Sequence, residues 1–280
     1  MRQDLLKRIP DHQEFARLDV DFRHLFLSWF NRGFVVLKAI DWNTPANILE
    51  KIIAYEAVHE ISNWDDLRGR LQPDDRRCFA FFHPAMADEP LVFVEVALTS
   101  APPAAINEIL EPDSAENKKT KNTATFYSIS NCQKGLQGIS FGNLLIKQVA
   151  SQLLQEEPGL QNFVTLSPVP GFRKWLDKEE IGEPIEEKIA NYAAHYLIAI
   201  KRGDGQPADP VARFHLANGA VLDRININAN ATQKGLEESH GVMVNYRYDL
   251  NAADANHEKY FHSHEVNASK TVKALAAKIA

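Results

Sequence analysis

The sequence predicts a mixed α/β fold, in which a mixed sheet follows a short helical N-terminal section. Two apolar runs within residues 78–98 are separated by the turn-forming segment MADEP, as is typical of adjacent antiparallel strands. Residues 125–166 then read as strand, glycine-bearing loop, helix and strand, which is the pattern of a crossover between neighbouring strands of one sheet. At 280 residues, the chain is long enough to bury a sizeable core.

The N-terminal section carries apolar residues at helical spacing from Asp4 to about Ala57. The pattern is clear in FRHLFLSWF, and again in ANILEKIIAYEAV after the capping pair Thr44-Pro45. We therefore divide the chain into a helical section, residues 1–70, and a sheet-containing domain, residues 71–280.

The sequence predicts further helices, strands and loops in the sheet-containing domain. Residues 104–110 read as a short helix, and DSAENKKTKN is a polar loop. Residues 183–202 predict an amphipathic helix, and GDGQPADP predicts a flexible connection. The remaining expectations are the strands VARFHL, AVLDRINI and GVMVNYRYDL, a polar surface loop at HEKYFHSHE, and a C-terminal helix at 269–280.

Charge and cysteine usage narrow the functional class. A net charge of -6 with scattered basic residues argues against a nucleic-acid partner. The two cysteines, Cys78 and Cys132, are too few for a secreted disulfide framework, and the strongest apolar run, 91–98, is far shorter than a membrane span requires. We expect a cytoplasmic protein with no membrane partner.

The glycine-bearing loop QKGLQGISFGNLLIK stands where a strand gives way to a helix. Glycine lets the backbone approach an oxyanion, and the free N–H groups of a first helical turn favour negative charge, so a pyrophosphate would fit. The loop has neither the Walker pattern nor the GxGxxG spacing, and an ordinary turn remains the alternative. The spacing from Gln137 through Ser140 to Gly142 resembles the acyl-CoA pyrophosphate signature of the N-acetyltransferase superfamily.

Seven stretches between Tyr55 and Tyr248 together resemble malonyl-CoA decarboxylase, in the order of that family. They are YEAVHEISNWDDLRGRL, DRRCFAFFHP, EPLVFVEVALT, FYSISNCQKGLQGISFGNLLIKQV, LSPVPGFRKWL, ARFHLANGAVLDRININ and GVMVNYRY. The resemblance implies an acetyltransferase-like catalytic domain at residues 71–280 that binds acyl-CoA, preceded by a helical domain. It also implies a carboxy-lyase of fatty acid metabolism, with malonyl-CoA as substrate and acetyl-CoA as product.

The family motifs also imply site residues. The motif LSPxPGF places the catalytic serine on Ser167, FHLxNGA places the catalytic histidine on His215, and the second tyrosine of NYRY, Tyr248, falls near the active site. The CoA-contacting loop falls on Gln137, Gly138, Ile139, Ser140, Phe141, Gly142 and Asn143. Some family members carry glutamate where Ser140 stands. The helical domain is shorter than usual here, so the resemblance leaves a homo-oligomer as one of the possible states.

The chemistry of the implied reaction suits these residue types. Loss of CO2 from malonyl-CoA leaves two electrons on C2, and the thioester carbonyl accepts them as an enolate that is then protonated. We therefore expect no metal and no cofactor beyond the CoA thioester. Histidine, with an ordinary pKa near ~6.5, suits donation and recovery of a proton near neutrality. The expected role of Ser167 is to bind the leaving carboxylate or to relay protons with His215.

Four other interpretations remain open from the residues alone. The same cofactor loop would serve an acyl-CoA-dependent N-acyltransferase or a non-catalytic acyl-CoA-binding homologue. His257, His262 and His264 could form a metal site, because imidazole is a good zinc ligand. Cys132 lies near a predicted helix start, where a thiolate is favoured, although a bystander thiol is the simpler interpretation.

Overall fold

The computed structural model describes residues 1–30, 34–111, 120–136 and 144–279. The chain divides into two compact units, which are treated separately below. The first comprises Met1–Val96 and Ser128–Val149, and the second comprises Ala97–Tyr127 and Ala150–Ala280. Within the described ranges, no helix combines the length and the apolar character that a bilayer crossing requires.

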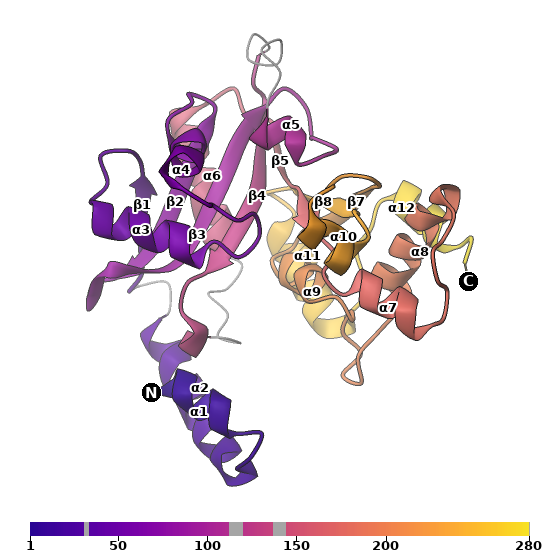
Figure 1. Ribbon diagram of the computed structural model, residues 1–280, viewed down its shortest axis with the longest axis horizontal. Helices are drawn as coiled ribbons and strands as arrows, with labels where there is room; N and C mark the ends of the chain where they lie inside the picture. Colours follow the sequence, from indigo (N-terminus) through magenta and orange to yellow (C-terminus); the bar gives the residue numbers. More distant parts are fainter. Residues whose placement is uncertain (31–33, 112–119, 137–143, 280) are drawn as a thin grey trace. The chain divides into compact units, whose positions relative to one another are not determined.

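Eight strands of the described chain form one mixed sheet, in the order β1-β2-β3-β4-β5-β8-β6, with β7 paired to β8 (Figure 1). Strands β4 and β5 are parallel, whereas β1–β2 and the three pairings of β8 are antiparallel. The strands are β1 Val36–Ile40, β2 Arg76–His83, β3 Met86–Thr99, β4 Thr123–Asn131, β5 Asn162–Thr165, β6 Ser167–Pro168, β7 Val221–Asn226 and β8 Met243–Tyr248. The predicted mixed α/β class is confirmed.

Helices occupy most of the remaining described chain. In the first unit they are α1 Arg2–Arg8, η1 Gln13–Phe15, α2 Ala16–Trp29, α3 Ala46–Tyr55, α4 Trp64–Leu71, η3 Lys134–Leu136 and the start of α6 Leu144–Glu156. In the second unit they are α5 Asn107–Leu110, α7 Phe172–Lys178, α8 Glu186–Ala199, α9 Pro210–Ala217, α10 Gln233–Ser239, α11 Ala253–Ser263 and α12 Lys270–Ala276.

The core of the first unit forms where α3 and α4 meet the sheet. Ile48 and Ile52 lie on one face of α3, because positions four apart in a helix share a face. They are buried in one cluster with Cys78, Ala80 and Phe82, which alternate along β2 and therefore point to the same side of the sheet. The apolar residues that alternate along β2 and those that recur at each turn of α3 thus pack into one apolar layer.

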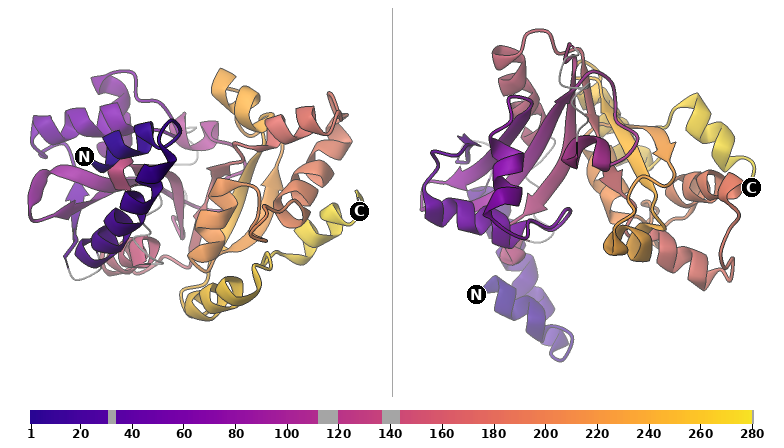
Figure 2. Two further views of the ribbon diagram at one scale, coloured as in Figure 1. Left: turned by 90° about the horizontal axis from the view of Figure 1, so that it is seen from below. Right: turned by 45° about the horizontal axis from the view of Figure 1, so that its top comes forward.

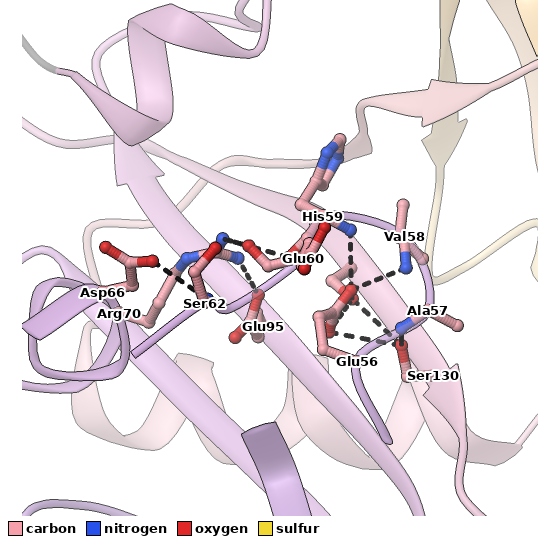
Figure 3. A network of polar contacts seen from close by, with 11 residues as sticks. Glu56, Ala57, Val58, His59, Glu60, Ser62, Asp66, Arg70, Glu95 and Ser130 are labelled. Atoms are coloured by element: carbon pink, nitrogen blue, oxygen red, sulfur yellow. Dashed lines mark hydrogen bonds and ion pairs between the residues drawn. The ribbon is translucent and has the colours of Figure 1, made fainter. Parts of the chain in front are cut away.

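The loop after α3 is fixed by a single carboxylate, that of Glu56 (Figure 3). Its Oε1 accepts hydrogen bonds from the backbone N–H groups of Val58 (2.7 Å) and His59 (2.8 Å). Ser128 Oγ donates to both of its oxygens, and Ser130 Oγ donates to Oε2 at 3.3 Å. Glu56 therefore ties this loop to β4.

A buried ion pair lies in the same unit (Figure 3). Arg70 Nη1, from α4, lies 2.8 Å from Glu95 Oε2, from β3, and the Glu95 side chain is fully buried. Arg70 Nη2 also donates to the backbone carbonyl oxygen of His59 at 3.1 Å. Charges are costly to bury unless paired, so each member of this pair depends on the other.

In the second unit, strands β7 and β8 lie side by side (orange in Figures 1 and 2). Helices α8 and α12 pack on each other and on β7. Leu197 of α8, Leu222 of β7 and Val272 of α12 have no exposed surface. This packing fixes the position of β7, and through their pairing that of β8.

Several predicted elements are confirmed. The apolar runs after residue 76 form β2 and β3, although the predicted turn MADEP is wrong: it begins β3, and the turn lies at residues 84–85. The crossover is present as β4, α6 and β5, with β4 and β5 parallel. The later segments AVLDRINI and GVMVNYRYDL form β7 and β8. The expected helices around 104–110, 183–202 and 269–280 appear as α5, α8 and α12.

Three predicted elements are wrong. Residues 36–40, expected within a helical section, form strand β1, which pairs with β2. The segment VARFHL, expected as a strand, is helix α9, because Asp209 caps its N-terminus and Pro210 occupies its first turn. The segment HEKYFHSHE, expected as a surface loop, forms most of helix α11, which ends at His264 in the left-handed conformation.

Candidate active site

Ser167 lies at a short break between two strands. Strand β5 ends at Thr165, and the two-residue strand β6 begins at Ser167, opposite Val244 of β8. Between them, the N–H of Leu166 donates to the carbonyl oxygen of Phe126 on β4. The Ser167 side chain is buried, so its hydroxyl must find partners inside the protein.

His215 is carried by helix α9, and both ends of this helix are fixed. At the start, Asp209 Oδ1 accepts a hydrogen bond from the N–H of Ala212 at 2.8 Å. At the end, Gly219 adopts a left-handed conformation (φ 79°), and its N–H donates to the carbonyl oxygen of Leu216. A Cβ atom at Gly219 would collide with the carbonyl oxygen of Ala253. The position of His215 is therefore set by a closely packed helix end.

Tyr248 and Tyr246 approach His215 from strand β8. Residues two apart on a strand face the same side, whereas Arg247 between them is exposed. The ring of Tyr246 stacks on the imidazole of His215, with centroids 4.5 Å apart and planes inclined by 25°. The backbone N–H of Tyr246 also donates to Thr165 Oγ1 at 3.2 Å.

These side chains form one buried line of hydrogen bonds. The Tyr248 hydroxyl lies 2.8 Å from His215 Nδ1, and His215 Nε2 lies 3.0 Å from Ser167 Oγ. Ser167 Oγ in turn donates to Thr165 Oγ1 at 2.9 Å. The structure thus brings together the three residues that the family motifs single out, Ser167, His215 and Tyr248.

Burial controls the protonation of this line. It lowers the pKa of His215 to about 3 and raises the pKa of Tyr248, so the imidazole is neutral and the phenol keeps its hydrogen at pH 7. The sequence had suggested a histidine that titrates near neutrality, and in the free protein this expectation is wrong. A neutral imidazole still acts as both donor and acceptor, one role for each ring nitrogen.

Asp209 has the opposite shift. Burial raises its pKa to about 6, although the hydrogen bond from the N–H of Ala212 favours the charged form. The carboxyl has no exposed surface, and its Oδ2 atom has no hydrogen-bond partner among the described residues. Helix α9 therefore joins two buried titratable groups whose charged forms are both disfavoured.

The remaining candidates from the sequence are not part of this line. The expected CoA-contacting residues, Gln137, Gly138, Ile139, Ser140, Phe141, Gly142 and Asn143, lie outside the described residues. Cys132 is buried, and burial, as the largest effect, raises the pKa of its thiol, which opposes a reactive thiolate.

The histidines of α11 and its end do not form a metal centre. His257 Nδ1 contacts the carbonyl oxygen of Ala217, whereas His262 Nδ1 contacts that of Glu258 within the helix. In the described ranges, no three His, Cys, Asp or Glu side chains are grouped in a way that could hold a metal ion. These contacts favour a structural role for His257 and His262.

Three site residues escaped the sequence analysis: Thr165, Asp209 and Tyr246. Thr165 stands two positions before the serine, on the same side of an extended segment, which is the one sequence signal that could have identified it. Asp209 precedes a proline, a signal for a helix start. For Tyr246 only the alternation with Tyr248 was available.

Two family models match most of the chain. The model described as malonyl-CoA decarboxylase C-terminal domain matches residues 33–184 and 177–279, and that of the N-terminal domain of the same enzyme matches residues 1–30. The mitochondrial malonyl-CoA decarboxylase of Rattus norvegicus is 35% identical over 331 residues, which cover 99% of this chain and 67% of that protein.

Solved structures extend the comparison to the fold. The malonyl-CoA decarboxylase of Rhodopseudomonas palustris is 48% identical, with a TM-score of 0.89 over 98% of this chain and 74% of that chain. That of Agrobacterium vitis is 49% identical, with a TM-score of 0.87 over 99% and 74%. The loading GNATL domain of CurA from Lyngbya majuscula is 16% identical, with a TM-score of 0.53 over 78% and 98%, a likeness of fold alone. The expected acetyltransferase-like fold is confirmed.

Proposed function

The chain belongs to the malonyl-CoA decarboxylase family, and from this premise we propose that Ser167, His215 and Tyr248 act as a proton relay in the decarboxylation. The activity itself, release of CO2 from malonyl-CoA by a carboxy-lyase, follows from membership of the family. The observation that carries the relay is the continuous, buried line of hydrogen bonds through the imidazole of His215.

The reaction needs three things from the protein. The bond between C2 and the carboxylate carbon breaks, CO2 leaves, and the electron pair spreads onto the thioester oxygen as an enolate. A proton must then join C2 to give acetyl-CoA. The protein has to orient the carboxylate out of the thioester plane, stabilise the enolate oxygen and supply this proton.

The buried line suits the last two tasks. The hydroxyl of Ser167 is a hydrogen-bond donor, and His215 Nε2 stands within hydrogen-bonding distance to replace a hydrogen that the serine gives up. The C2 carbanion is a stronger base than the alkoxide or the imidazolate that remains when a neutral serine or histidine gives up its hydrogen. Neutral donors are therefore sufficient. Because the thioester carbonyl accepts the electrons, the proposal requires no metal and no further cofactor.

The CoA end of the substrate is assigned from sequence similarity. We assign its pyrophosphate to Gln137–Asn143, on the strength of the acetyltransferase-like spacing of this segment. The proposal therefore predicts that substitutions in this segment raise the KM for malonyl-CoA, whereas substitutions in the relay lower kcat.

One assay tests the function directly. Purified full-length protein is incubated with malonyl-CoA and no acyl acceptor, and acetyl-CoA and CO2 are followed by mass spectrometry. In D2O, the acetyl-CoA should carry one deuterium at C2. An amine acyltransferase would release no CO2 under these conditions, and tight binding without turnover would indicate a non-catalytic homologue.

Variants test the relay. Ser167→Ala and His215→Ala should each retain the fold and lower kcat by roughly 10²- to 10³-fold, the usual effect of removing one such donor. A buried hydroxyl outside the line provides the control: Thr125 Oγ1 lies 3.1 Å from Thr99 Oγ1. Thr125→Val should keep near-normal turnover. Near-normal acetyl-CoA production by the Ser167 or His215 variant would refute the proposed relay.

A further inference from the structure

Thr165 is the last member of the buried line, and its hydroxyl oxygen is held from two sides. Ser167 Oγ donates to Thr165 Oγ1 at 2.9 Å, and the backbone N–H of Tyr246 donates to the same oxygen at 3.2 Å. The backbone carbonyl of Thr165 accepts a hydrogen bond from Asn245 Nδ2 at 2.8 Å. Two successive residues of β8 thus hold Thr165: Asn245 binds its backbone carbonyl, and Tyr246 binds the hydroxyl oxygen toward which the hydroxyl of Ser167 points.

This arrangement decides the direction of every hydrogen bond in the line. Ser167 has one hydroxyl hydrogen, and Thr165 receives it. The contact with His215 Nε2 at 3.0 Å must then be a donation from Nε2–H to the serine oxygen. A neutral imidazole carries one N–H, so Nδ1 is left as an acceptor for the hydroxyl of Tyr248.

We propose that Thr165 is a positioning residue that fixes the tautomer of His215, with the hydrogen on Nε2, by holding the hydroxyl hydrogen of Ser167. If Ser167 donated to Nε2 instead, His215 would carry its hydrogen on Nδ1, facing Tyr248. The line would then run the opposite way. The chemistry that follows rests on the function proposed above, whereas the tautomer is a property of the free protein.

The direction of the line decides where protons can go. When C2 takes the hydrogen of Ser167, the serine oxygen takes the hydrogen of His215 Nε2, and Nδ1 takes the hydrogen of Tyr248. A proton from solvent then restores the phenol, so that charges and atoms balance. The imidazole is left with its hydrogen on Nδ1, and it must exchange this for a hydrogen on Nε2 before the next turnover. In the reversed line, Nε2 has no hydrogen to give, so a serine that donated to C2 would remain an alkoxide. Only the tautomer set by Thr165 therefore feeds protons toward Ser167.

The tautomer is measured by NMR on the full-length protein labelled with ¹⁵N in its histidine rings. The ten histidines are sorted by comparison with His215→Gln, whose spectrum lacks the signals of the site. In the wild-type protein at pH 7, Nε2 of His215 should be protonated and Nδ1 should not. In Thr165→Val, which has no acceptor oxygen, the hydrogen should move to Nδ1. Thr165→Ser keeps the oxygen and should restore the wild-type spectrum.

Activity gives a second reading. Thr165→Val should lower kcat by roughly 10- to 100-fold, with the KM for malonyl-CoA changed by less than about twofold, because a misplaced imidazole hydrogen impairs proton transfer rather than binding. Thr165→Ser should recover most of the rate. Thr125→Val, which also removes a buried hydroxyl in the same unit, should match the wild-type protein in both spectrum and kcat.

The outcomes separate this inference from the proposed function. A wild-type protein with the hydrogen on Nδ1, or a Thr165→Val variant that keeps it on Nε2, would overturn the role of Thr165, and neither result needs an active enzyme. If Thr165→Val does not fold, Thr165→Ala, which also lacks the acceptor oxygen, takes its place with the same expected shift of the hydrogen to Nδ1. A tautomer that follows Thr165 in a protein whose His215→Ala variant keeps full turnover would support the positioning and reject the relay.

Discussion

Asp209 and His215 stand at opposite ends of helix α9, and burial moves their pKa values in opposite directions. The pKa of Asp209 rises to about 6, and that of His215 falls to about 3. Between about pH 4 and pH 6, the folded protein keeps a proton on Asp209 that the unfolded chain releases. In the same window the unfolded chain takes up a proton at His215 that the folded protein does not bind.

The two contributions to the pH dependence of stability should therefore nearly cancel. His215 destabilises the folded protein as pH falls below ~6.5, whereas Asp209 destabilises it as pH rises above ~3.9. We expect Asp209→Asn, which keeps a capping oxygen, to leave the His215 contribution exposed. Relative to wild type, its free energy of unfolding should rise by up to about 1.4 kcal/mol per pH unit between pH 4 and 6. Urea unfolding at several pH values measures this.

The converse variant supplies the control. His215→Gln leaves Asp209 in place, so its stability relative to wild type should fall as pH rises through the same window. Two variants whose stability curves run parallel to that of the wild type between pH 4 and 6 would contradict the shifted pKa values.

The end of helix α9 gives a second prediction. Gly219→Ala should lower the free energy of unfolding by about 3 kcal/mol or more, because the new Cβ adds a collision with Ala253 to the cost of a left-handed residue. Gly182 is also left-handed (φ 69°) but has nothing within 4 Å of an added Cβ. Gly182→Ala should thus cost only about 1–2 kcal/mol. Equal losses in thermal unfolding would argue against the collision.

The ion pair between Arg70 and Glu95 gives a third prediction. Arg70→Met removes the cation that faces a fully buried carboxylate and should cost about 3–5 kcal/mol. Replacing both residues, Arg70→Met with Glu95→Gln, should be less destabilising than the single arginine change, because the buried negative charge is gone. A double-mutant cycle by urea unfolding gives the coupling, and a double variant no better than Arg70→Met would contradict the prediction.

Two tyrosines on β8 give a matched pair of variants. Tyr248→Phe removes the hydroxyl next to His215 Nδ1 and should lower kcat by about tenfold or more. Tyr246→Phe keeps the ring that stacks on the imidazole and removes a hydroxyl that has no hydrogen-bond partner among the described residues. It should keep kcat within about twofold and should not lose stability. Steady-state kinetics of both variants would reveal a contrary order.

The sequence predicted the architecture well where periodicity is local. The β2–β3 pair and the β4–α6–β5 crossover have clear apolar patterns. The turn between β2 and β3 was placed two residues too late, because MADEP begins β3. The segment VARFHL misled because its residues suit a strand, whereas Asp209-Pro210 in front of it supplies the helix start. Strand β1 was missed because five residues after a helical pattern carry too weak a signal, and their pairing with β2 decides their conformation.

Only the site residues that lie in family motifs could be predicted from the sequence. Ser167, His215 and Tyr248 follow from short family stretches, and the structure brings them together. The roles of Thr165 and Tyr246 depend on which strands adjoin and in what register, and single-sequence patterns do not contain that information. The low pKa of His215 likewise depends on its burial in the folded protein, and the residues around the motif do not show how deeply its side chain is buried.

The pairing of β7 with β8 restricts how this region can change over evolutionary time. Strand β7 accommodates one extra residue, Asp223, at the irregularity between Leu222 and Arg224, so its length has room to vary. A single insertion or deletion within β8 would instead turn Arg247 toward the imidazole in place of the two tyrosines. We therefore expect insertions and deletions between related proteins to occur in β7, and the number of residues in β8 to stay constant.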